Sequence, residues 1–392
     1  MPTESLGEEL DGRSERVHRD HRDYRGYPTT ARFVAPELRP VHGIAVVPAR
    51  VLVVVPTLNE ESHIGRVLDS LLAEAPRFSQ MRIVVADGGS TDQTVPLVEA
   101  AALIHPEVFL LHNAARIQSA GINLAVRRFG RDSDVLIRCD AHALYPAEFC
   151  RRLLETMGRT EADAVVVSLD SIGHGCLQRA VAWVSNSPVG TGGSAHRAGR
   201  RSGFVDHGHH AAFRIDRFRT SGGYDETFTH NEDAELDCRQ RALGAKVYLD
   251  AGIRVGYHPR PTLAGLWTQY FNYGAGRSRT ARRHPGSLRL RQLAVPAHLL
   301  LSGLALAVSP WFVGALAWPA LYVGVLAGTS LLLAVRHRSA CGLLAGPAAA
   351  VMHTAWGCGF LSALMTRREP AWRPEMATPL WADADANLGG RA

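Results

Sequence analysis

Lysine is almost absent from this sequence of 392 residues, in which Lys246 is the only one. The formal net charge of +6 therefore comes almost entirely from arginine, and the arginines are scattered except over residues 277–291. We attribute this skew to coding bias, and no stretch combines basic and aromatic residues as nucleic-acid-binding modules do. The composition thus argues against a nucleic-acid partner.

Paired cysteine motifs and a secretory leader are also missing. None of the six cysteines belongs to a CxxC pair, which argues against a zinc framework and against the disulfide framework of a small secreted protein. We predict reduced, buried thiols in a protein that faces the cytoplasm. Residues 1–48 have mixed charge and no apolar core of a signal peptide, so we predict a disordered tail.

A GxGxxG loop does not follow the first apolar run, which disfavours a dehydrogenase-type dinucleotide fold. Short β-branched runs instead alternate with segments of helical spacing, and we expect Asn59 to cap the first helix. The expected strands are VLVVV (51–55), RIVVA (82–86), VFLLH (108–112) and DVLI (134–137). This order predicts a parallel sheet that helices cover on both faces.

Ligands of such sheets bind at the carboxyl ends of the strands. Four polar segments occupy that edge in this sequence. They are Pro56–Glu60, Asp87–Asp92, Asn113–Arg116 and Asp140–His142. The chemistry is therefore expected along this edge.

Asp140 ends the fourth expected strand, and His142 follows two residues later. In an extended segment both side chains point to the same side. A carboxylate that holds Mg²⁺ or Mn²⁺ can offset the charge of a diphosphate, and imidazole suits Mn²⁺ better than Mg²⁺. Read alone, RCDAHALYP could equally be a polar strand end.

Asn231, Glu232 and Asp233 open a later expected helix. A helix N-terminus stabilises a carboxylate as the anion, as a group that takes a proton from a hydroxyl requires. The same acids could simply complement the helix dipole.

A run of more than forty uncharged residues begins at Leu293, and a second apolar segment spans 341–365. These lengths predict two to three hydrophobic helices in a membrane region, 286–368, followed by a tail, 369–392. A buried helical hairpin of a soluble domain is the alternative. The arginines of 277–291, with no acid among them, predict a cytoplasmic catalytic domain at the plasma or inner membrane, with anionic lipid as a second possible partner.

Five segments together resemble family 2 glycosyltransferases, and specifically the membrane-associated, succinoglycan-type members. They are PTLNEE, ADGGSTDQT, RCDAHALYP, GGYDETFTHNEDAELDCR and QYFNYGAGR, which occur in this order over about residues 50–285. The resemblance implies a GT-A fold over 49–285, which is Rossmann-like with a mostly parallel sheet and helices on both faces, followed by C-terminal transmembrane helices.

The resemblance also implies roles for single residues. Asp233, with Glu232 beside it, matches the catalytic base, and Asp140 with His142 matches the metal-binding DxD motif. The nucleotide-sugar-binding positions are Pro56, Thr57, Asn59, Glu60, Asp87, Arg116, Gln118 and Asp140. Gln269, Tyr273 and Arg277 match the acceptor or diphosphate side loosely.

The sequence departs from the family pattern at three places. His142 replaces the second DxD carboxylate, and Gly88 replaces a frequent second acid. Three histidines stand where an apolar acceptor segment is expected, namely His207, His209 and His210. Polar acceptor contacts or plain loop positions fit them better than a metal site does.

The implied function is inverting transfer of a hexose, with UDP as the expected carrier, to a lipid-linked saccharide in cell-surface polysaccharide synthesis. A Mg²⁺ or Mn²⁺ ion would assist, and the membrane would be the site of action. A polyprenyl-phosphate sugar synthase and a non-catalytic membrane-docked sugar-nucleotide binder remain alternatives. The sequence leaves open whether two or three helices span the membrane.

Overall fold

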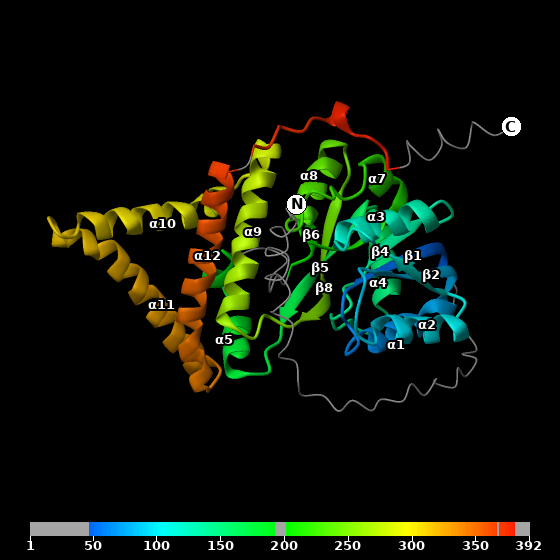
Figure 1. Cartoon of the computed structure of the whole chain (residues 1–392), viewed down its shortest axis with the longest axis horizontal. Coiled ribbons are helices and arrows are strands. Elements are labelled where there is room, and N and C mark those ends of the chain that lie inside the picture. Colours follow the sequence, from blue (N-terminus) through cyan, green and yellow to red (C-terminus); the bar gives the residue numbers. More distant parts are fainter. Residues whose placement is uncertain (1–46, 193–200, 367, 381–392) are drawn as a thin grey trace, which may run out of the picture. The chain divides into compact units, whose positions relative to one another are not determined.

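The computed structural model describes residues 47–192, 201–366 and 368–380. The tail predicted over residues 1–48 lies almost wholly outside the described residues, as does the end of the tail predicted over 369–392. Figure 1 shows the sheet with its covering helices and the long C-terminal helices.

Eight strands form one sheet, in the order β3-β2-β1-β4-β7-β5-β8-β6. Parallel pairing joins β1 to β2 and β4, β2 to β3, and β5 to β8. Antiparallel pairing joins β7 to β4 and β5, and β6 to β8. The sheet is therefore mostly parallel, and the four strands expected near its start are confirmed. The strands are β1 (Val47–Thr57), β2 (Phe78–Asp87), β3 (Val108–His112), β4 (Val135–Arg138), β5 (Ala164–Ser171), β6 (Gly203–Phe204), β7 (His209–Arg214) and β8 (Val247–Tyr257).

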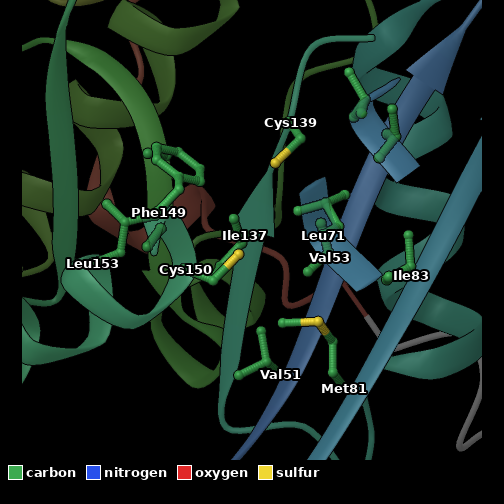
Figure 2. Packing of buried hydrophobic residues seen from close by; sticks show 14 of the residues in the cluster. Val51, Val53, Leu71, Met81, Ile83, Ile137, Cys139, Phe149, Cys150 and Leu153 are labelled. Atoms are coloured by element: carbon green, nitrogen blue, oxygen red, sulfur yellow. The ribbon is translucent and has the colours of Figure 1, made fainter. Parts of the chain in front are cut away.

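Apolar side chains fill a layer on each face of this sheet. Successive residues of β1 alternate between the layers: Val51 and Val53 belong to one buried cluster, and Leu52 and Val54 to the other. Figure 2 shows the first layer, with Val53 beside Ile137 and Leu71. Each such side chain contributes about 1.5–3 kcal/mol by leaving water. The sheet is thus covered on both faces, as the apolar runs predict.

The helices that accompany the sheet connect strands or follow them. They are α1 (Ile64–Leu72), α2 (Thr94–Ile104), α3 (Gln118–Phe129), α4 (Phe149–Thr160), α5 (Cys176–Ser185), α6 (Pro188–Thr191), α7 (Ile215–Thr220), α8 (Glu232–Ala242) and α9 (Leu263–Arg283).

Asn59 does not cap the first helix, contrary to expectation. His63 occupies the N-cap position of α1, and Asn59 adopts a left-handed backbone conformation with φ 57°. Its side-chain oxygen accepts from the backbone N–H of Thr91 at 2.8 Å. The Asn59 side chain therefore binds the loop after β2 instead of the first turn of α1.

Three apolar helices follow α9: α10 (Leu290–Val308), α11 (Ala317–Arg336) and α12 (Ala345–Thr366). All three are long and apolar enough to cross a membrane by length and composition. The prediction that all cysteines are reduced is wrong for one pair. Cys176 of α5 forms a disulfide with Cys341, in the turn before α12, because the fold brings these positions together across 165 residues.

The basic cluster before α10 contacts protein. Arg279 pairs with Glu369 at 2.8 Å, and Arg289 pairs with Asp206. Arg282 donates to the carbonyl of Ala363 at 2.9 Å. These arginines therefore join α9 and its continuation to segments far away in the sequence, a use that their spacing does not reveal.

Candidate active site

The carboxyl ends of β1, β2 and β4 meet because β1 lies between the other two strands. Thr57 at the end of β1 is in register with Asp87 at the end of β2. On the other side, Val54 is in register with Arg138, the last residue of β4. The segments that begin at Pro56, Asp87 and Cys139 therefore leave the same edge of the sheet, as predicted.

Backbone and side-chain hydrogen bonds join the first loop to the second. The N–H of Asn59 donates to Ser90 Oγ at 2.8 Å, and the N–H of Glu60 donates to Thr94 Oγ1 at 2.7 Å. The two loops form one surface.

Asp87 is buried and serves as the acceptor for its own loop. One carboxylate oxygen accepts from the N–H groups of Gly89 and Ser90 at 2.8 and 2.9 Å, and the other accepts from the hydroxyls of Ser90 and Thr57. A carboxylate has about four lone-pair positions, so these donors occupy its capacity. Asp87 therefore shapes the backbone of its own loop.

Arg116 lies near the end of the third loop, and Gln118 is the first residue of α3. The Arg116 guanidinium donates to the carbonyls of Gly88 and Gly89 at 2.9 and 3.3 Å. The Gln118 amide donates to Asp140 Oδ1 at 2.9 Å. These two positions bridge the second and fourth strand ends.

His142 is linked to the first loop through Glu60. Its Nδ1 lies 2.8 Å from Glu60 Oε1, and His63 contacts the other carboxylate oxygen at 3.2 Å. Burial raises the pKa of Glu60, but the hydrogen bonds with the two histidines outweigh it and lower this pKa to about 2. The hydrogen bond to Glu60 raises the pKa of His142. The pair therefore fixes the orientation of the imidazole.

Asp140 lies where three cationic or polar side chains converge. Arg138 Nε lies 3.6 Å from Oδ1, and His209 Nε2 lies 3.6 Å from Oδ2. Burial raises the pKa of Asp140, but the charges of Arg138, His209 and His142 outweigh it, so the pKa is lowered. Asp140 is thus held as a carboxylate with its side chain 23% exposed.

Arg138, which sequence reasoning did not single out, joins Asp140 to the start of α8. Its guanidinium forms an ion pair with Asp233 and lies 3.5 Å from Glu232. Tyr224 completes the group by donating to Asp233 Oδ1 at 3.1 Å. An arginine at the end of an otherwise apolar strand was the available signal, because burial of such a charge requires partners.

Glu232 and Asp233 are differently placed in this group. Burial, reinforced by the charge of Asp233, raises the pKa of Glu232 to about 7. Glu232 therefore holds a proton more readily than an exposed glutamate does.

His209 faces both predicted functional aspartates. In addition to its approach to Asp140, its Nδ1 lies 4.0 Å from Asp233 Oδ2. His207 instead contacts the buried Asp237 at 2.8 Å, behind this group. His210 belongs to β7, and its side chain lies outside the described positions. Within the described ranges, no group of three or more His, Cys, Asp or Glu side chains could hold a metal ion by itself.

The three predicted acceptor-side residues on α9 do not lie together. The Gln269 amide donates to the hydroxyls of Tyr257 and Tyr273 at 2.7 and 3.1 Å, at the end of β8. Arg277 is buried and donates to Ser287, in the segment that leads to α10. Burial lowers the pKa of Arg277. Gln269 and Tyr273 therefore share a polar surface, and Arg277 joins α9 to the next segment.

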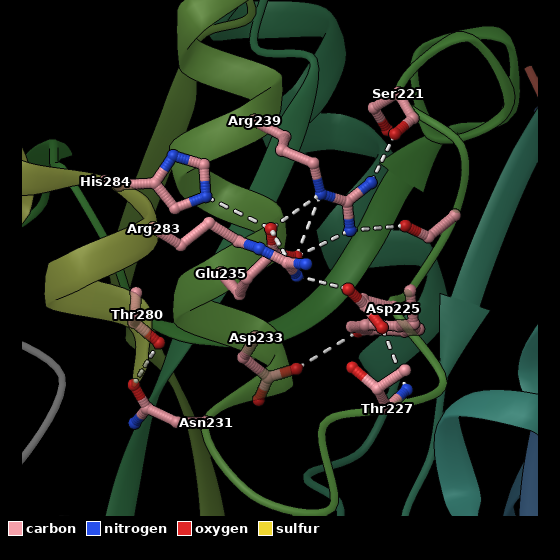
Figure 3. Close-up of polar contacts among 12 residues, drawn as sticks. Ser221, Asp225, Thr227, Asn231, Asp233, Glu235, Arg239, Thr280, Arg283 and His284 are labelled. Atoms are coloured by element: carbon pink, nitrogen blue, oxygen red, sulfur yellow. Dashed lines mark hydrogen bonds and ion pairs between the residues drawn. The ribbon is translucent and has the colours of Figure 1, made fainter. Parts of the chain in front are cut away.

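A second buried network holds α8 against α9 (Figure 3). Glu235, one turn after Glu232, accepts a bifurcated hydrogen bond from Arg239 Nε, with both carboxylate oxygens 2.9 Å away. His284 Nε2 lies 3.1 Å from the same carboxylate. Arg283 in turn pairs with Asp225. The helix that presents Asp233 is thus fixed from its buried side.

Comparison with known proteins identifies the family of this chain. The model of "Glycosyl transferase family 2" matches residues 52–221. The "Succinoglycan biosynthesis protein ExoA" of Rhizobium meliloti (strain 1021) is 42% identical, over 81% of this chain and 96% of that protein.

Two more distant similarities extend the comparison. A dolichyl N-acetyl-alpha-D-glucosaminyl phosphate 3-beta-D-2,3-diacetamido-2,3-dideoxy-beta-D-glucuronosyltransferase of Methanococcus voltae is 22% identical over 59% of this chain and 74% of that one. The solved structure of the mannosyltransferase PcManGT from Pyrobaculum calidifontis, in complex with GDP-Man and Mn²⁺, aligns with a TM-score of 0.50 and 19% identity, covering 82% and 89% of the two chains. The last similarity supports the GT-A fold. The chain belongs to glycosyl transferase family 2 and is a glycosyltransferase of the succinoglycan type.

Proposed function

We propose that this glycosyltransferase moves a hexose from UDP to the hydroxyl of a lipid-linked saccharide, with inversion at the anomeric carbon. One observation carries the proposal: Asp140 and Asp233 both contact the guanidinium of Arg138. Arg138 Nε lies 3.6 Å from Asp140 Oδ1, and Arg138 forms an ion pair with Asp233. The relative from Methanococcus voltae, named for transfer to a dolichyl-phosphate-linked sugar, supports this class of acceptor.

Asp233 is the proposed base. Its place at the start of α8 stabilises its anion, and the charge of Arg138 adds to this effect. It would take the proton of the acceptor hydroxyl as the oxygen attacks the anomeric carbon, opposite the departing diphosphate. Hydrolytic inversion uses a second carboxyl as general acid, whereas a diphosphate can leave without one if its charge is offset.

Asp140 and His142 are the proposed ligands of a divalent cation, Mn²⁺ or Mg²⁺. Metal-binding histidines commonly direct their other ring nitrogen to a carboxylate, and His142 Nδ1 contacts Glu60 in this way. A cation that also binds phosphate oxygens needs only one or two protein ligands. When bound, it would supply positive charge to the leaving diphosphate. The Mn²⁺ in the PcManGT complex is consistent with this proposal.

The remaining predicted residues are assigned to the donor and the acceptor. The first and second loops, with Pro56, Thr57, Asn59, Glu60 and Asp87, would hold the nucleotide. Arg116 and Gln118 would approach the diphosphate from the third loop. Gln269 and Tyr273 would contact the acceptor, and Arg277 would support the segment behind them. The catalytic domain, residues 49–285, would face the cytoplasm, where nucleotide sugars are made, with a membrane region following it.

Turnover by purified Asp233→Asn and Asp140→Ala variants tests the proposal. Each should lose at least about a hundredfold in transfer from a UDP-hexose, the range that positioned proton transfer provides. Asp132→Asn, at an exposed site before β4, is the matched control and should retain activity. Undiminished transfer by both active-site variants would refute the assignment.

The same variants separate the alternatives. A lipid phosphate needs little base catalysis, so a mild effect of Asp233→Asn with a severe effect of Asp140→Ala would indicate a polyprenyl-phosphate sugar synthase. Thermal protection by UDP sugars without transfer to any lipid extract would indicate a binding protein.

A further inference from the structure

Helix α12 lies alongside α9 of the catalytic domain (Figure 1). Their backbones approach closely at two glycines. A Cβ atom at Gly274 would lie 1.9 Å from the carbonyl oxygen of Trp356, and one at Gly359 would lie 2.0 Å from that of Phe271. Only glycine permits such contacts, so the two helices are fitted to each other. The hydrophobicity that makes α12 resemble a membrane span is used in this contact.

Helix α9 in turn belongs to the catalytic domain. A Cβ atom at Gly276 would lie 2.5 Å from the carbonyl oxygen of His230, just before α8. Thr280 Oγ1 donates to Asn231 Oδ1 at 3.1 Å, at the helix that presents Asp233. A helix with this polar contact surface is not placed in the hydrocarbon of a bilayer.

The segment after α12 returns to the catalytic domain. Glu369 has a side chain only 5% exposed and pairs with Arg279 at 2.8 Å and with Arg283 at 3.3 Å. The N–H of Trp372 donates to the carbonyl of Arg283 at 2.9 Å. The N–H of Leu380 donates to the carbonyl of Arg219, in the last turn of α7, at 3.0 Å. Residues 369–380 thus lie on the catalytic side.

The end of α11 is attached to the same domain. Cys341, just beyond α11, is joined to Cys176 of α5. The His337 ring stacks on Trp183 of α5 with centroids 4.1 Å apart. The chain is therefore held to the catalytic domain both before α10 and after α11.

Between these attachments, α10 and α11 expose apolar side chains. Of the most apolar 18 residues in each segment, 11% are buried in Leu290–Val308 and 22% in Val313–Arg336, against 44% in Ala340–Thr366, which contains α12. Trp311, Phe312 and Val313, in the turn between α10 and α11, are 84%, 64% and 73% exposed. An exposed apolar surface of this extent requires a partner.

We infer that α10 and α11 form the lipid-contacting element of the described chain, that they enter and leave the bilayer on the side of the catalytic domain, and that α12 is a docked helix of that domain. Because residues 283 and 369 are in contact, the chain between them crosses the membrane an even number of times. This excludes three spans. The inference requires membrane association but not the proposed sugar chemistry.

The ends of the element identify lipid as its partner. Arg289, which also pairs with Asp206, and Arg291 lie at the start of α10, and Arg336 and Arg338 lie at the end of α11, with no Asp, Glu, Lys or Arg over 292–335. Basic residues at both ends of an uncharged stretch are suited to the headgroup region on one face of a membrane. A protein partner would not require this symmetry.

Protease protection of tags at both ends of the full chain tests the topology. In right-side-out and inverted vesicles, we expect the N-terminal and C-terminal tags to be digested together, in one orientation only. Digestion of the two tags in opposite orientations would overturn the inference. Activity is not needed for this readout, so its failure is distinguishable from failure of the proposed function.

Quenching of tryptophan fluorescence by lipids brominated in the acyl chains tests the contact. In vesicles, Trp311→Phe should reduce the quenched fraction, because that fraction would include Trp311. The matched control Trp372→Phe, in the segment on the catalytic domain, should leave the quenched emission unchanged. Equal quenching in the Trp311→Phe variant and the unmodified protein would overturn the inference. The inference would also be overturned if the quenched fraction fell in Trp372→Phe and not in Trp311→Phe.

Discussion

Arg138 and Asp233 form an ion pair across 95 residues of sequence, with side chains 5% and 16% exposed. One belongs to the central strand β4 and the other to the first turn of α8. The same guanidinium approaches Asp140. The aspartate proposed to hold a cation and the one proposed to take a proton are therefore set relative to each other by a single buried cation.

Replacing Arg138 with methionine should lower kcat by about ten- to a hundredfold, because a hydrogen bond to a charged group contributes about 1.5–3 kcal/mol. Arg138→Lys should retain part of the activity, since lysine keeps the charge but not the fork of donors. Steady-state kinetics of both variants, with KM and kcat separated, is the measurement. Full activity of Arg138→Met would show that the pair does not position Asp233.

A thermal midpoint for each variant controls for misfolding. Loss of one member of a buried ion pair destabilises a protein by about 3–5 kcal/mol, so Arg138→Met should melt earlier, and Arg138→Lys should recover part of this loss because it keeps the charge. If Arg138 positions Asp233, Arg138→Lys should have a higher kcat than Arg138→Met, and this difference in kcat should exceed what their difference in thermal midpoint explains.

Local patterns predicted the strands and loops of this edge, because runs such as Val51–Val55 are apolar on both faces of a parallel sheet. Arg138 was missed because its partners Tyr224, Glu232 and Asp233 lie 86 to 95 residues away in sequence. The packing of α12 was unpredictable for a related reason. The apolar sequence of α12 predicts that its surface is removed from water, but it does not predict whether lipid or α9 covers that surface.

Ser90→Ala tests whether Asp87 acts through its loop. Ser90 gives Asp87 two of its hydrogen bonds, and its hydroxyl also receives the N–H of Asn59. Loss of this hydroxyl should weaken UDP binding by about threefold to tenfold, in line with about 1 kcal/mol for one hydrogen bond.

Calorimetric titration with UDP is the measurement for Ser90→Ala, and Asp87→Asn is the companion variant. If Asp87 only reads the base, Ser90→Ala will bind UDP as the unmodified protein does, and Asp87→Asn alone will be impaired.

Glu60→Gln tests the orientation of His142. An amide accepts the hydrogen bond of the imidazole less strongly than a carboxylate does. We expect the activating concentration of Mn²⁺ to rise by about ten- to a hundredfold, as for other partners of metal-binding histidines. Mn²⁺ binding followed by electron paramagnetic resonance in the presence of UDP checks this without turnover.

His142→Asp is the companion to Glu60→Gln. It restores a carboxylate pair with Asp140 and should shift preference from Mn²⁺ toward Mg²⁺. An unchanged metal preference in His142→Asp, together with unchanged Mn²⁺ binding in Glu60→Gln, would remove His142 from the cation site.

Glu369→Gln tests whether the C-terminal segment stabilises the catalytic domain. Glu369 is the partner of both Arg279 and Arg283, and Arg283 also pairs with Asp225 near the buried network of α8. Loss of the Glu369 charge removes one ion-pair partner from each of two partly buried guanidinium groups. The free energy of unfolding should fall by about 3 kcal/mol, and the thermal midpoint should fall with it. Glu375→Gln, at an exposed position of the same segment, is the matched control and should melt as the unmodified protein does. Equal midpoints for Glu369→Gln and Glu375→Gln would mean that the segment rests on the domain without stabilising it, and that the same-side attachment rests on its backbone hydrogen bonds alone.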